Sequence, residues 1–400
     1  MSAPLDMLLA LGSGELVLLF WLMIIMDVPR YLLSTFVVAI APGRYPQGQT
    51  SFQVSAVVSC YNEEKTVAAC VGALRAAGVE EIVAVDDGSE DDTRLVLPSL
   101  GVIVLRNEER QGKPTSVNKA LAHCTGDLVV ICDADTTLAP EAIATVKPYF
   151  LDPDVAGVGL NLRVRNAHVS LITRLQAIEY AVQFTAGRMC SDAFGILPNV
   201  SGAGGVFRRE ALTAVGGLDV EVAEDAALAM KLRRAGWKLR YAGNAYASTN
   251  VPEDITGLTL QRLRWDASII TIWLFKFGGM VNPIARNLTG SNLVTSLDVL
   301  VFSVVLQLVF PVYVWWIWTK VGATAFVILG AVMLGLAVLD GIIVLLVGLP
   351  LRLVPYVPLY LIEQTFVLRP LRVFALAAEL AFSITRHDDY VPKAQRWRLT

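Results

Sequence analysis

The chain carries acidic residues directly after short apolar runs, a placement suited to binding a cation. In "LVVICDADTTLAP" (Leu128 to Pro140), a five-residue apolar run leads into Asp133 and Asp135. If the chain stays extended there, both side chains point the same way. Mg²⁺ and Mn²⁺ prefer oxygen ligands, and Mg²⁺ commonly combines one or two carboxylates with the phosphates of a substrate. The pair is therefore a candidate metal site that would hold a diphosphate, although such acids can also form a solvated turn or cap a helix.

Two further acidic segments could bind the rest of a nucleotide. "YNEE" (Tyr61 to Glu64) and "DDGSEDDT" (Asp86 to Thr93) each follow an apolar run. A tyrosine ring can stack on a base, carboxylates can accept hydrogen bonds from the N–H and hydroxyl groups of base and ribose, and a lysine beside a glycine can face the diphosphate. The same residue types also form turns and helix starts. The candidate nucleotide-sugar ligands from these two segments are Tyr61, Glu63, Asp86 and Asp87, and Lys113 of "RQGKPTSVNKAL" (Arg110 to Leu121) is a candidate for the diphosphate.

A candidate general base lies in the second half of the chain. "VAEDAALAMKLRRAGWKL" (Val222 to Leu239) predicts a helix that opens on Glu224 and Asp225. Acids at a helix start complement its dipole, but Asp225 could also take the proton from an incoming sugar hydroxyl. Upstream, "SGAGGVFRRE" (Ser201 to Glu210) has three glycines in four positions, which suits either close approach of backbone to a ligand or a flexible turn. We assign Gly202 and Glu224 to acceptor binding.

A helix with an arginine and a tryptophan on one face completes the candidate site. In "TLQRLRWDASIITIWLFKFG" (Thr259 to Gly278), the residues Gln261, Arg264 and Trp265 have helical i, i+3 and i+4 spacing. Arg264 could hold a diphosphate, and the Trp265 ring could support a sugar lying flat on it. The alternative is a helix at the membrane surface, where Arg and Trp are also common.

The acidic segments occur where alternating strands and helices would bring them together. Such an alternation predicts an α/β fold with a mostly parallel sheet and helices on both faces, which binds ligands beyond the carboxyl ends of its strands. No GxGxxG or GxxxxGK[ST] pattern occurs in this region, which argues against Rossmann and P-loop sites. The predicted strands are Gln53–Cys60, Glu81–Val85, Val102–Arg106 and Asp127–Cys132, and the predicted helices are Glu63–Gly78 and Pro114–Gly126.

Composition places this soluble domain between membrane segments. Of the 400 residues 54% are hydrophobic and 17% are charged, which is too apolar for a wholly soluble chain of this size. The predicted organisation is an N-terminal transmembrane helix (1–45), a soluble domain (52–277), a C-terminal transmembrane region (290–385) and a basic tail (386–400). Within these, we predict amphipathic interface helices at about 171–189 and 256–278, spans at about 292–318 and 323–349, and an interfacial or further spanning segment at 355–384.

Charge distribution predicts the orientation and excludes some partners. The first fourteen residues contain no Lys or Arg, whereas the last fifteen contain three Arg and one Lys. The positive-inside rule then places the domain and the tail in the cytoplasm, as part of a multi-pass protein of the cell membrane. A net charge of −3 without a basic run argues against nucleic acid. Three dispersed histidines and five cysteines without a CxxC pair argue against a zinc site.

The motifs "CYNEE", "VDDGS", "GKPTSVNKAL", "CDADT", "SGAGGVFRRE", "AED" and "QRLRW", in this order over residues 52–277, resemble a membrane-bound family 2 glycosyltransferase with a GT-A fold. The likeness is strongest to the processive group of cellulose, hyaluronan, chitin-oligosaccharide and poly-N-acetylglucosamine synthases. The resemblance implies an inverting, metal-dependent hexosyltransferase that uses a UDP-sugar and extends a β-linked saccharide, which it could also secrete. It also implies base catalysis by Asp225, a metal on Asp135, and a clamp formed by Gln261, Arg264 and Trp265. By the same resemblance, Asp133 would contact the UDP part together with Tyr61, Glu63, Asp86, Asp87 and Lys113.

Two positions depart from the family pattern. The usual "TED" is "AED" here, with Ala223 in place of threonine, which keeps both acids. The synthases often continue after Arg-Trp with Ala-Arg-Gly, whereas this chain has "DAS" from Asp266 to Ser268. That difference leaves open an alternative in which one sugar is transferred to a membrane lipid. The expected partners are therefore a UDP-sugar, a saccharide or lipid acceptor, and membrane lipids.

Overall fold

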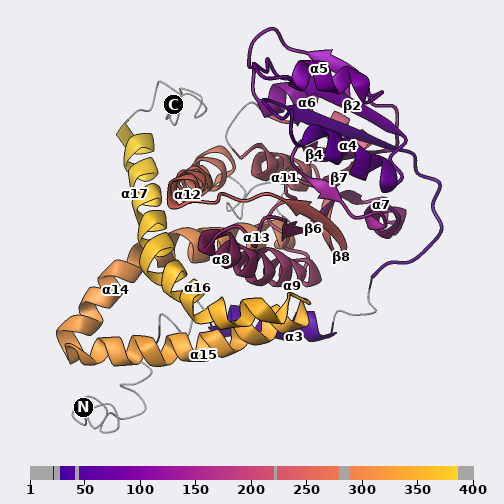
Figure 1. Cartoon of the computed structure of the whole chain (residues 1–400). Helices are drawn as coiled ribbons and strands as arrows, with labels where there is room; N and C mark the ends of the chain where they lie inside the picture. Colours follow the sequence, from indigo (N-terminus) through magenta and orange to yellow (C-terminus); the bar gives the residue numbers. More distant parts are fainter. Residues whose placement is uncertain (1–20, 22–27, 41–44, 220–222, 279–288, 386–400) are drawn as a thin grey trace.

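An eight-stranded mixed sheet forms the centre of the molecule (Figure 1). The computed structural model describes residues 21, 28–40, 45–219, 223–278 and 289–385. The strand order is β3-β2-β1-β4-β7-β6-β8-β5, in which β1 to β4 are parallel and β7 runs antiparallel to both β4 and β6. The strands are β1 (Val54–Cys60), β2 (Glu81–Asp86), β3 (Ile103–Arg106), β4 (Leu128–Asp133), β5 (Thr137–Leu138), β6 (Val155–Val164), β7 (Gly205–Arg208) and β8 (Lys238–Thr249).

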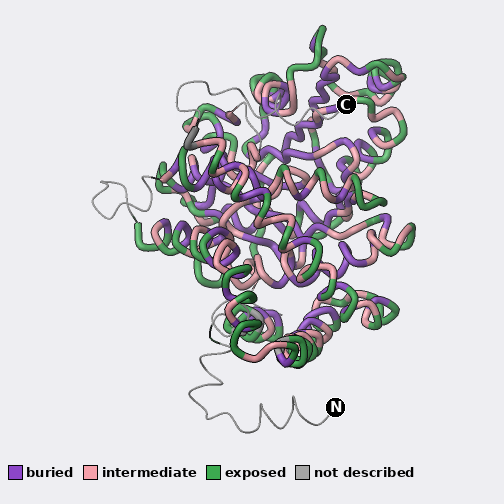
Figure 2. Tube along the Cα trace, turned by 90° about the vertical axis from the view of Figure 1, so that its left-hand side faces the viewer, coloured by how far each residue is buried: buried purple, intermediate pink, exposed green. Residues whose placement is uncertain are grey.

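Alternate residues of the central strands enter two hydrophobic layers. In β1, Ala56 and Val58 pack in the layer that contains α4 (Val67–Ala76), whereas Val57 packs in the layer that contains α6 (Lys113–Leu121). This period of two is expected of a strand that is buried on both faces. Figure 2 accordingly shows buried segments through the middle of the molecule and exposed segments around them. Both layers hold the carboxyl ends of the parallel strands in fixed positions.

Several helices connect the strands and cover the sheet. Their positions along the chain follow the alternating pattern expected from the sequence as far as β4. Helix α4 begins four residues later than the predicted start at Glu63, because Thr66 and Val67 donate backbone hydrogen bonds to the Glu63 carbonyl in a turn. The further helices of the domain are α5 (Thr93–Ser99), α7 (Ala142–Val146), α8 (Leu171–Glu179), α9 (Gly187–Ala193), α10 (Arg209–Ala214), α11 (Glu224–Arg234) and α12 (Ile255–Ile269).

The helix predicted over Val222–Leu239 is shorter in the structure. Helix α11 ends at Arg234, and Gly236 follows with a φ of +92°, a conformation that favours glycine. Strand β8 then begins at Lys238. The prediction was wrong at this end because it extended the helical pattern through the glycine that terminates the helix.

Helices α3 (Val28–Ile40), α14 (Leu306–Val321) and α15 (Thr324–Leu346) lie at the end of the molecule opposite α5 (Figure 1). Two stretches, Gly290–Val321 and Leu329–Leu346, are long and apolar enough to cross a membrane by length and composition. The first comprises α13 (Gly290–Leu300), a π-helical turn and α14; the second lies in α15. Helix α3 packs against α15. Most of the predicted N-terminal helix (1–45) and all of the predicted tail (386–400) lie outside the described residues.

The segment predicted at 355–384 is divided in the structure. It contains α16 (Val357–Glu363), a π-helical turn at Gln364–Leu368, and α17 (Arg369–Thr385), which packs along α12. The Arg372 Nε atom donates to Asp266 Oδ1 at 2.8 Å. Asp266, which departs from the family pattern, thus ties the C-terminal helix to the domain.

Candidate active site

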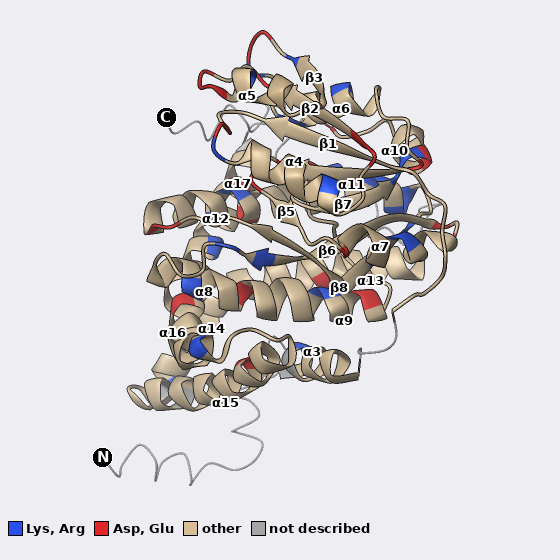
Figure 3. Cartoon of the chain, turned by 45° about the vertical axis from the view of Figure 1, so that its right-hand side comes forward, with Lys and Arg blue, Asp and Glu red and all other residues tan. Residues whose placement is uncertain are grey.

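The carboxyl ends of three parallel strands meet, as the sequence predicts. In the sheet register Cys60 at the end of β1 pairs with Asp86 of β2, and Ser59 pairs with Asp133 of β4. Tyr61 to Glu64 follow β1 between these two strands. The acidic segments therefore gather at one edge of the sheet, and Figure 3 shows acidic loops beside α5 at this end.

Lys113, at the start of α6, joins segments that are far apart in the sequence. Its Nζ atom lies 2.5 Å from Asp133 Oδ1 and 3.4 Å from Glu224 Oε1, and it donates to the Gly202 carbonyl at 3.2 Å. Burial acts to lower the pKa of Lys113, but the Asp133 and Glu224 carboxylates outweigh it and raise the pKa well above that of an ordinary lysine. Lys113 is therefore a permanent cation between the β4 end and the start of α11.

Gly202 lies where no side chain fits without displacement of its neighbours. A Cβ atom at this position would lie 3.0 Å from Lys113 Nζ, 3.4 Å from Glu224 Oε1 and 3.6 Å from the Asp225 Cβ. Contacts of 3.0 Å are tighter than a carbon normally makes, so the lysine would have to move. The glycine lets the backbone enter the cluster, whereas close approach of this backbone to a ligand stays a prediction.

Asp225 lies in the first turn of α11 beside this cluster. Its Oδ2 atom accepts from Asn199 Nδ2 at 3.3 Å, and Oδ1 accepts from the Ala226 backbone N–H at 2.7 Å. Burial raises the pKa of Asp225, the Glu224 charge raises it further, and Lys113 opposes both. A partly buried carboxylate with a raised pKa is chemically suited to accept a proton.

Two features around Asp225 were not predicted from the sequence. Asn199 precedes the glycine-rich segment by only a few positions, but asparagine in a loop is too common to signal a role. Ala223, two residues before Asp225, has a φ of +61°, a left-handed conformation that non-glycine residues rarely adopt. The turn into α11 is therefore locally strained where it presents Asp225.

Asp133 and Asp135 are close together, but not by the predicted extended chain. Strand β4 ends at Asp133, and the Thr136 N–H donates to the Asp133 carbonyl at 3.0 Å, which places Asp135 in a turn. Asp135 Oδ1 accepts from Thr136 Oγ1 and Thr249 Oγ1, both at 3.2 Å. Burial raises the pKa of Asp135, and repulsion from Asp133 adds to the effect.

A divalent cation would relieve the repulsion between Asp133 and Asp135. These two residues would supply part of the ligands that such a cation needs. Two carboxylates supply hard oxygen ligands, while a substrate diphosphate can supply the others. Among the described residues no group of three or more His, Cys, Asp or Glu side chains is arranged to hold a metal ion by itself. The residues therefore fit a metal that is shared with a bound substrate.

The loops after β1 and β2 are locked to each other. The N–H groups of Asn62, Glu63 and Glu64 donate to side chains of the second loop, at 3.0 Å to Ser89, 2.7 Å to Thr93 and 3.1 Å to Asp91. In return, two N–H groups of the second loop donate to side chains of the first, from Glu90 to Asn62 Oδ1 at 2.9 Å and from Asp92 to Glu64 Oε2 at 3.1 Å. The two loops form one rigid wall, which we call the interlocked loops (residues 62–64 and 89–93).

Burial raises the pKa of Glu63, which belongs to the same acidic site. A hydrogen bond from Thr66 opposes this rise, whereas the charges of Asp135 and Asp133 add to it. The electrostatic effect of Asp133 and Asp135 thus reaches the loop after β1. One further negative group at this wall supports the interpretation that a cation or a donor-rich ligand binds here.

Asp86 and Asp87 have different environments. Asp87 is buried and fully engaged, because it accepts from Gln111 N–H at 2.9 Å, Gly112 N–H at 2.8 Å and Asn107 Nδ2 at 2.7 Å. It fixes the loop that leads into Lys113. Asp86 accepts from Ser89 N–H at 2.9 Å through Oδ1. Its buried Oδ2 accepts no hydrogen bond among the described residues, but it lies 3.8 Å from Arg106 Nε in an ion pair.

The Tyr61 ring has a cation on one face. The Arg110 guanidinium carbon lies 4.1 Å from the ring centroid. Arg110 therefore covers one face of the ring that sequence analysis assigned to base stacking. A base would have to use the other face or stack on the guanidinium plane.

Helix α12 presents the predicted clamp residues in three different environments. Arg264 is exposed and forms no hydrogen bond or ion pair within the described part of the chain. The Gln261 Oε1 atom is buried and lacks a hydrogen-bond partner there. Trp265 is half-buried, lies edge-on to Phe184 at 6.0 Å, and has the Arg262 guanidinium carbon 4.4 Å from its ring centroid.

Arg262 is a residue that sequence reasoning missed. It is buried and pairs with the buried Glu179 of α8 at 2.6 Å. The spacing to Trp265 favoured Arg264, because the sequence alone does not show which arginine of "QRLRW" enters the interior. The buried acid in α8, 83 residues away, supplies that information only in the folded chain.

Comparison with known proteins agrees with this geometry. Residues 52–268 match the family described as "Glycosyltransferase like family 2". A protein named poly-beta-1,6-N-acetyl-D-glucosamine synthase from Staphylococcus aureus is 29% identical over 225 residues, and its counterpart from Staphylococcus epidermidis is 28% identical over 220. Each match covers 53% of this chain and 53% of the relative, so the chain spans about half the length of the curated relatives it matches.

A solved structure shows that the likeness of fold extends beyond the domain. The mannosyltransferase PcManGT from Pyrobaculum calidifontis, determined with GDP-Man and Mn²⁺, superposes with a TM-score of 0.58 over 92% of this chain and 97% of that one, at 19% identity. The predicted GT-A α/β fold with flanking helices is thereby confirmed. With the family match covering more than half of the chain and the acidic motifs gathered at one edge of the sheet, the chain belongs to the glycosyltransferase like family 2.

Proposed function

We propose that the chain transfers a sugar from a UDP-sugar to the hydroxyl of an acceptor at the membrane and so elongates a β-linked polysaccharide or oligosaccharide. The observation that carries the proposal is the cluster at Lys113, where Asp133, Glu224 and the Gly202 carbonyl meet next to Asp225. Family membership and the names of the staphylococcal relatives support sugar transfer and polymer synthesis. The proposed location is the cell membrane, with several spans and the catalytic domain in the cytoplasm.

In the proposed reaction Asp225 acts as the general base. The acceptor oxygen forms a bond to the anomeric carbon while the bond from that carbon to the diphosphate breaks. UDP leaves with the electron pair, and Asp225 takes the acceptor proton. This direct displacement inverts the anomeric configuration and requires no protein nucleophile. Asn199 orients the Asp225 carboxylate through its hydrogen bond.

On the donor side, Asp86 Oδ2 accepts no hydrogen bond among the described residues and has only the 3.8 Å ion pair with Arg106, so it is a suitable acceptor for a ribose hydroxyl or base N–H. Glu63 belongs to the interlocked loops, and Tyr61 directly precedes them. Asp87 accepts hydrogen bonds from the loop that leads into Lys113 and so positions this lysine. Lys113 pairs with Asp133, and its ammonium group has further N–H donors that would bind the diphosphate when a donor arrives. We also assign Gln261 and the exposed Arg264 to the donor phosphates.

We assign the acceptor side to Trp265, Gly202 and Glu224. The acceptor is a saccharide in the main proposal and a lipid in the alternative, in which a single sugar is transferred. Asp133 and Asp135 would hold Mg²⁺ or Mn²⁺, which when bound would offset the charge of the leaving diphosphate. Chelation should therefore abolish turnover, and added Mg²⁺ or Mn²⁺ should restore it.

The experiment is to incubate the purified chain in lipid with a panel of UDP-sugars and to measure UDP release and product mass. One donor should support turnover, and a ladder of products differing by one sugar is expected. A single glycolipid would instead support the alternative. Asp225→Asn should lower turnover by about 10²- to 10⁴-fold, the usual contribution of a general base.

The matched control is Glu210→Gln, because Glu210 is an exposed acid at the start of a different helix. UDP binding should be retained in both variants, since neither residue is assigned to the nucleotide. Turnover of Asp225→Asn comparable to that of Glu210→Gln would overturn the base assignment.

A further inference from the structure

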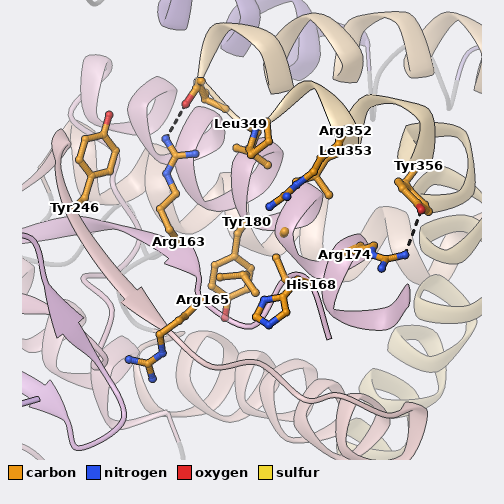
Figure 4. Close-up of a pocket in the computed structure, with 16 residues that line it drawn as sticks. Arg163, Arg165, His168, Arg174, Tyr180, Tyr246, Leu349, Arg352, Leu353 and Tyr356 are labelled. Carbon is orange, nitrogen blue, oxygen red and sulfur yellow. Dashed lines mark hydrogen bonds between the residues drawn. The ribbon is translucent and has the colours of Figure 1, made fainter. Parts of the chain in front are cut away.

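A cationic cavity of about 640 Å³ lies between the end of β6, helix α8 and the segment that follows α15 (Figure 4). Four arginines and one histidine line it, and no Asp or Glu side chain of the described residues does: Arg163, Arg165, Arg174, Arg352 and His168. Tyrosine rings and aliphatic side chains form the rest of the wall. None of the residues assigned to sugar transfer lines this cavity.

Neutral groups, rather than acids, bind the arginines of this cavity. Arg163 Nη2 donates to the Val347 carbonyl at 2.7 Å, and Arg174 Nη1 donates to the Tyr356 hydroxyl at 3.1 Å. In the part of the chain that the structure describes, no carboxylate oxygen lies within 4.0 Å of a nitrogen of the four arginines. Grouped guanidinium ions repel one another, so an anionic ligand would stabilise the cavity.

The cavity also borders an apolar surface. Its wall includes Leu349 and the buried Leu353, in the segment directly after the candidate span Leu329–Leu346. At the end of that span Leu346 is 46% exposed, and the nearby Leu351 is 73% exposed. A ligand could therefore place an anionic group among the arginines and hydrocarbon along the end of α15.

We propose that this cavity binds the phosphate group of an anionic membrane lipid. Arginine forms paired hydrogen bonds with phosphate oxygens, and Figure 4 shows Arg163 and Arg352 on two sides of the space in front of Tyr180. The inference goes beyond the proposed function and does not depend on it. A free phosphate would share the headgroup chemistry but not the apolar contact, so the two sources can be separated.

The cavity is linked to the acidic site through Arg165. Its Nη2 atom donates to the Asp135 carbonyl, and Nη1 donates to Thr137 Oγ1 at 3.4 Å. The same side chain contributes to the cavity wall. The Arg165 side chain therefore connects the cavity to the segment that we assign to the metal.

The test measures binding to the purified full chain in detergent, without any donor sugar. The probes are dioctanoyl phosphatidic acid, inorganic phosphate and dioctanoyl phosphatidylcholine, titrated by calorimetry. Phosphatidic acid should bind at least tenfold more tightly than inorganic phosphate or phosphatidylcholine. In the double variant Arg163→Gln/Arg352→Gln its affinity should fall at least tenfold.

Two variants make the result specific. Arg352→Gln alone should weaken binding without affecting thermal unfolding, because Arg352 is exposed and has no described partner. Arg94→Gln, on an exposed part of α5, should bind like the unchanged chain. Unchanged affinity in the double variant would overturn the site, and equal affinity for phosphate and phosphatidic acid would overturn the lipid as its ligand.

Discussion

At the scale of single residues, one cation organises the candidate site. Lys113 lies between Asp133 and Glu224, and its charge also opposes the rise of the Asp225 pKa. Three carboxylates from two distant segments can remain close together because this lysine offsets part of their repulsion. A variant that displaces the Lys113 ammonium group should therefore test this arrangement.

Gly202→Ala tests this position with the smallest possible change. The new Cβ would lie 3.0 Å from Lys113 Nζ, so the lysine must shift away from the Gly202 carbonyl and Asp133. We expect kcat/KM to fall about tenfold, which corresponds to about 1.4 kcal/mol of transition-state stabilisation. The free energy of unfolding should change by less than about 1 kcal/mol, because a flexible side chain can adapt.

The matched control is Gly72→Ala in α4, where a Cβ would meet nothing within 4 Å. This change should leave kcat/KM unaltered and increase the free energy of unfolding by about 0.5 to 1 kcal/mol, as expected for alanine in a helix interior. Equal activity of Gly202→Ala and Gly72→Ala would contradict the role assigned to the Gly202 backbone.

Glu224→Gln should move the acid limb of the pH profile. The Glu224 charge raises the pKa of Asp225, and removing it also frees Lys113 to act on Asp225. The pKa of Asp225 therefore falls, and the base becomes ionised at lower pH. In a pH profile of kcat/KM, the acid limb should shift to lower pH even if the maximal rate decreases. An unchanged acid limb in Glu224→Gln would indicate that another group controls it.

The raised pKa of Asp225 also predicts how this residue affects the stability of the fold at different pH values. Because folding raises this pKa, the stability contribution of Asp225 is full below the ordinary aspartate pKa and is lost as the pH rises through the folded value. Asp225→Asn should therefore unfold at a higher temperature than the unchanged chain at pH 7, with a smaller difference at pH 4. Thermal unfolding of both chains at the two pH values measures this difference.

At the scale of elements, four charges join three helices around Trp265. Glu179 of α8 pairs with Arg262 of α12, and Asp266 of α12 pairs with Arg372 of α17. Burial raises the pKa of Glu179, whereas Arg262 acts to lower it. These four charges sum to zero, and paired charges are the usual condition in an interior. It holds the helix that carries Trp265.

Arg262→Met should destabilise the fold because it leaves Glu179 buried without its partner. The expected loss in free energy of unfolding is about 3 to 5 kcal/mol at pH 7. The loss should become smaller at lower pH, since a protonated Glu179 no longer carries the uncompensated charge. Thermal or denaturant unfolding of the purified chain in detergent measures both effects.

The double variant Glu179→Gln/Arg262→Met provides the control. Removing both charges should recover part of the lost stability, because no isolated charge then remains at this pair. Destabilisation equal to the sum of the two single changes would show that the two residues do not interact.

The sequence predicted the four parallel strands β1 to β4 and their shared edge, because both follow from local patterns, but it did not predict β5 to β8. Apolar runs ending in acids gave β1, β2 and β4, and parallel pairing then brought Asp86 and Asp133 to either side of β1. Contacts between distant segments could not be predicted in this way. The pairing of Arg262 with Glu179 is one such contact, and the Asp135 turn is another, since Thr249 of β8 stabilises it from 114 residues away.

At the scale of the whole molecule, the catalytic sheet lies towards one end and α3, α14 and α15 lie at the other, while α13 contacts α11 of the domain (Figure 1). Helices α8, α9 and α12 lie between them. Arg30 of α3 and Asp298 of α13 approach to 2.6 Å and join the N-terminal and C-terminal apolar segments. This layering supports the proposal that the domain lies on one side of a membrane.

Replacing Leu95 with cysteine should show on which side of the membrane the domain lies. Leu95 lies on α5 and is 63% exposed, so Leu95→Cys in a Cys190→Ser background offers a reactive thiol while the other four cysteines are buried. A membrane-impermeant maleimide should label it in inside-out vesicles but not in intact cells. Labelling in intact cells would contradict the cytoplasmic placement predicted from the basic tail.

The interlocked loops have a consequence for the thermodynamics of donor binding. Because the amides of Asn62, Glu63 and Glu64 are already bonded across the wall, a nucleotide would meet a surface that does not have to become ordered. Ordering a mobile side chain on association typically costs about 0.5 to 1.5 kcal/mol, and this wall would avoid that cost. These three amides should exchange slowly with deuterium before any donor is added, and saturating UDP should slow them little further.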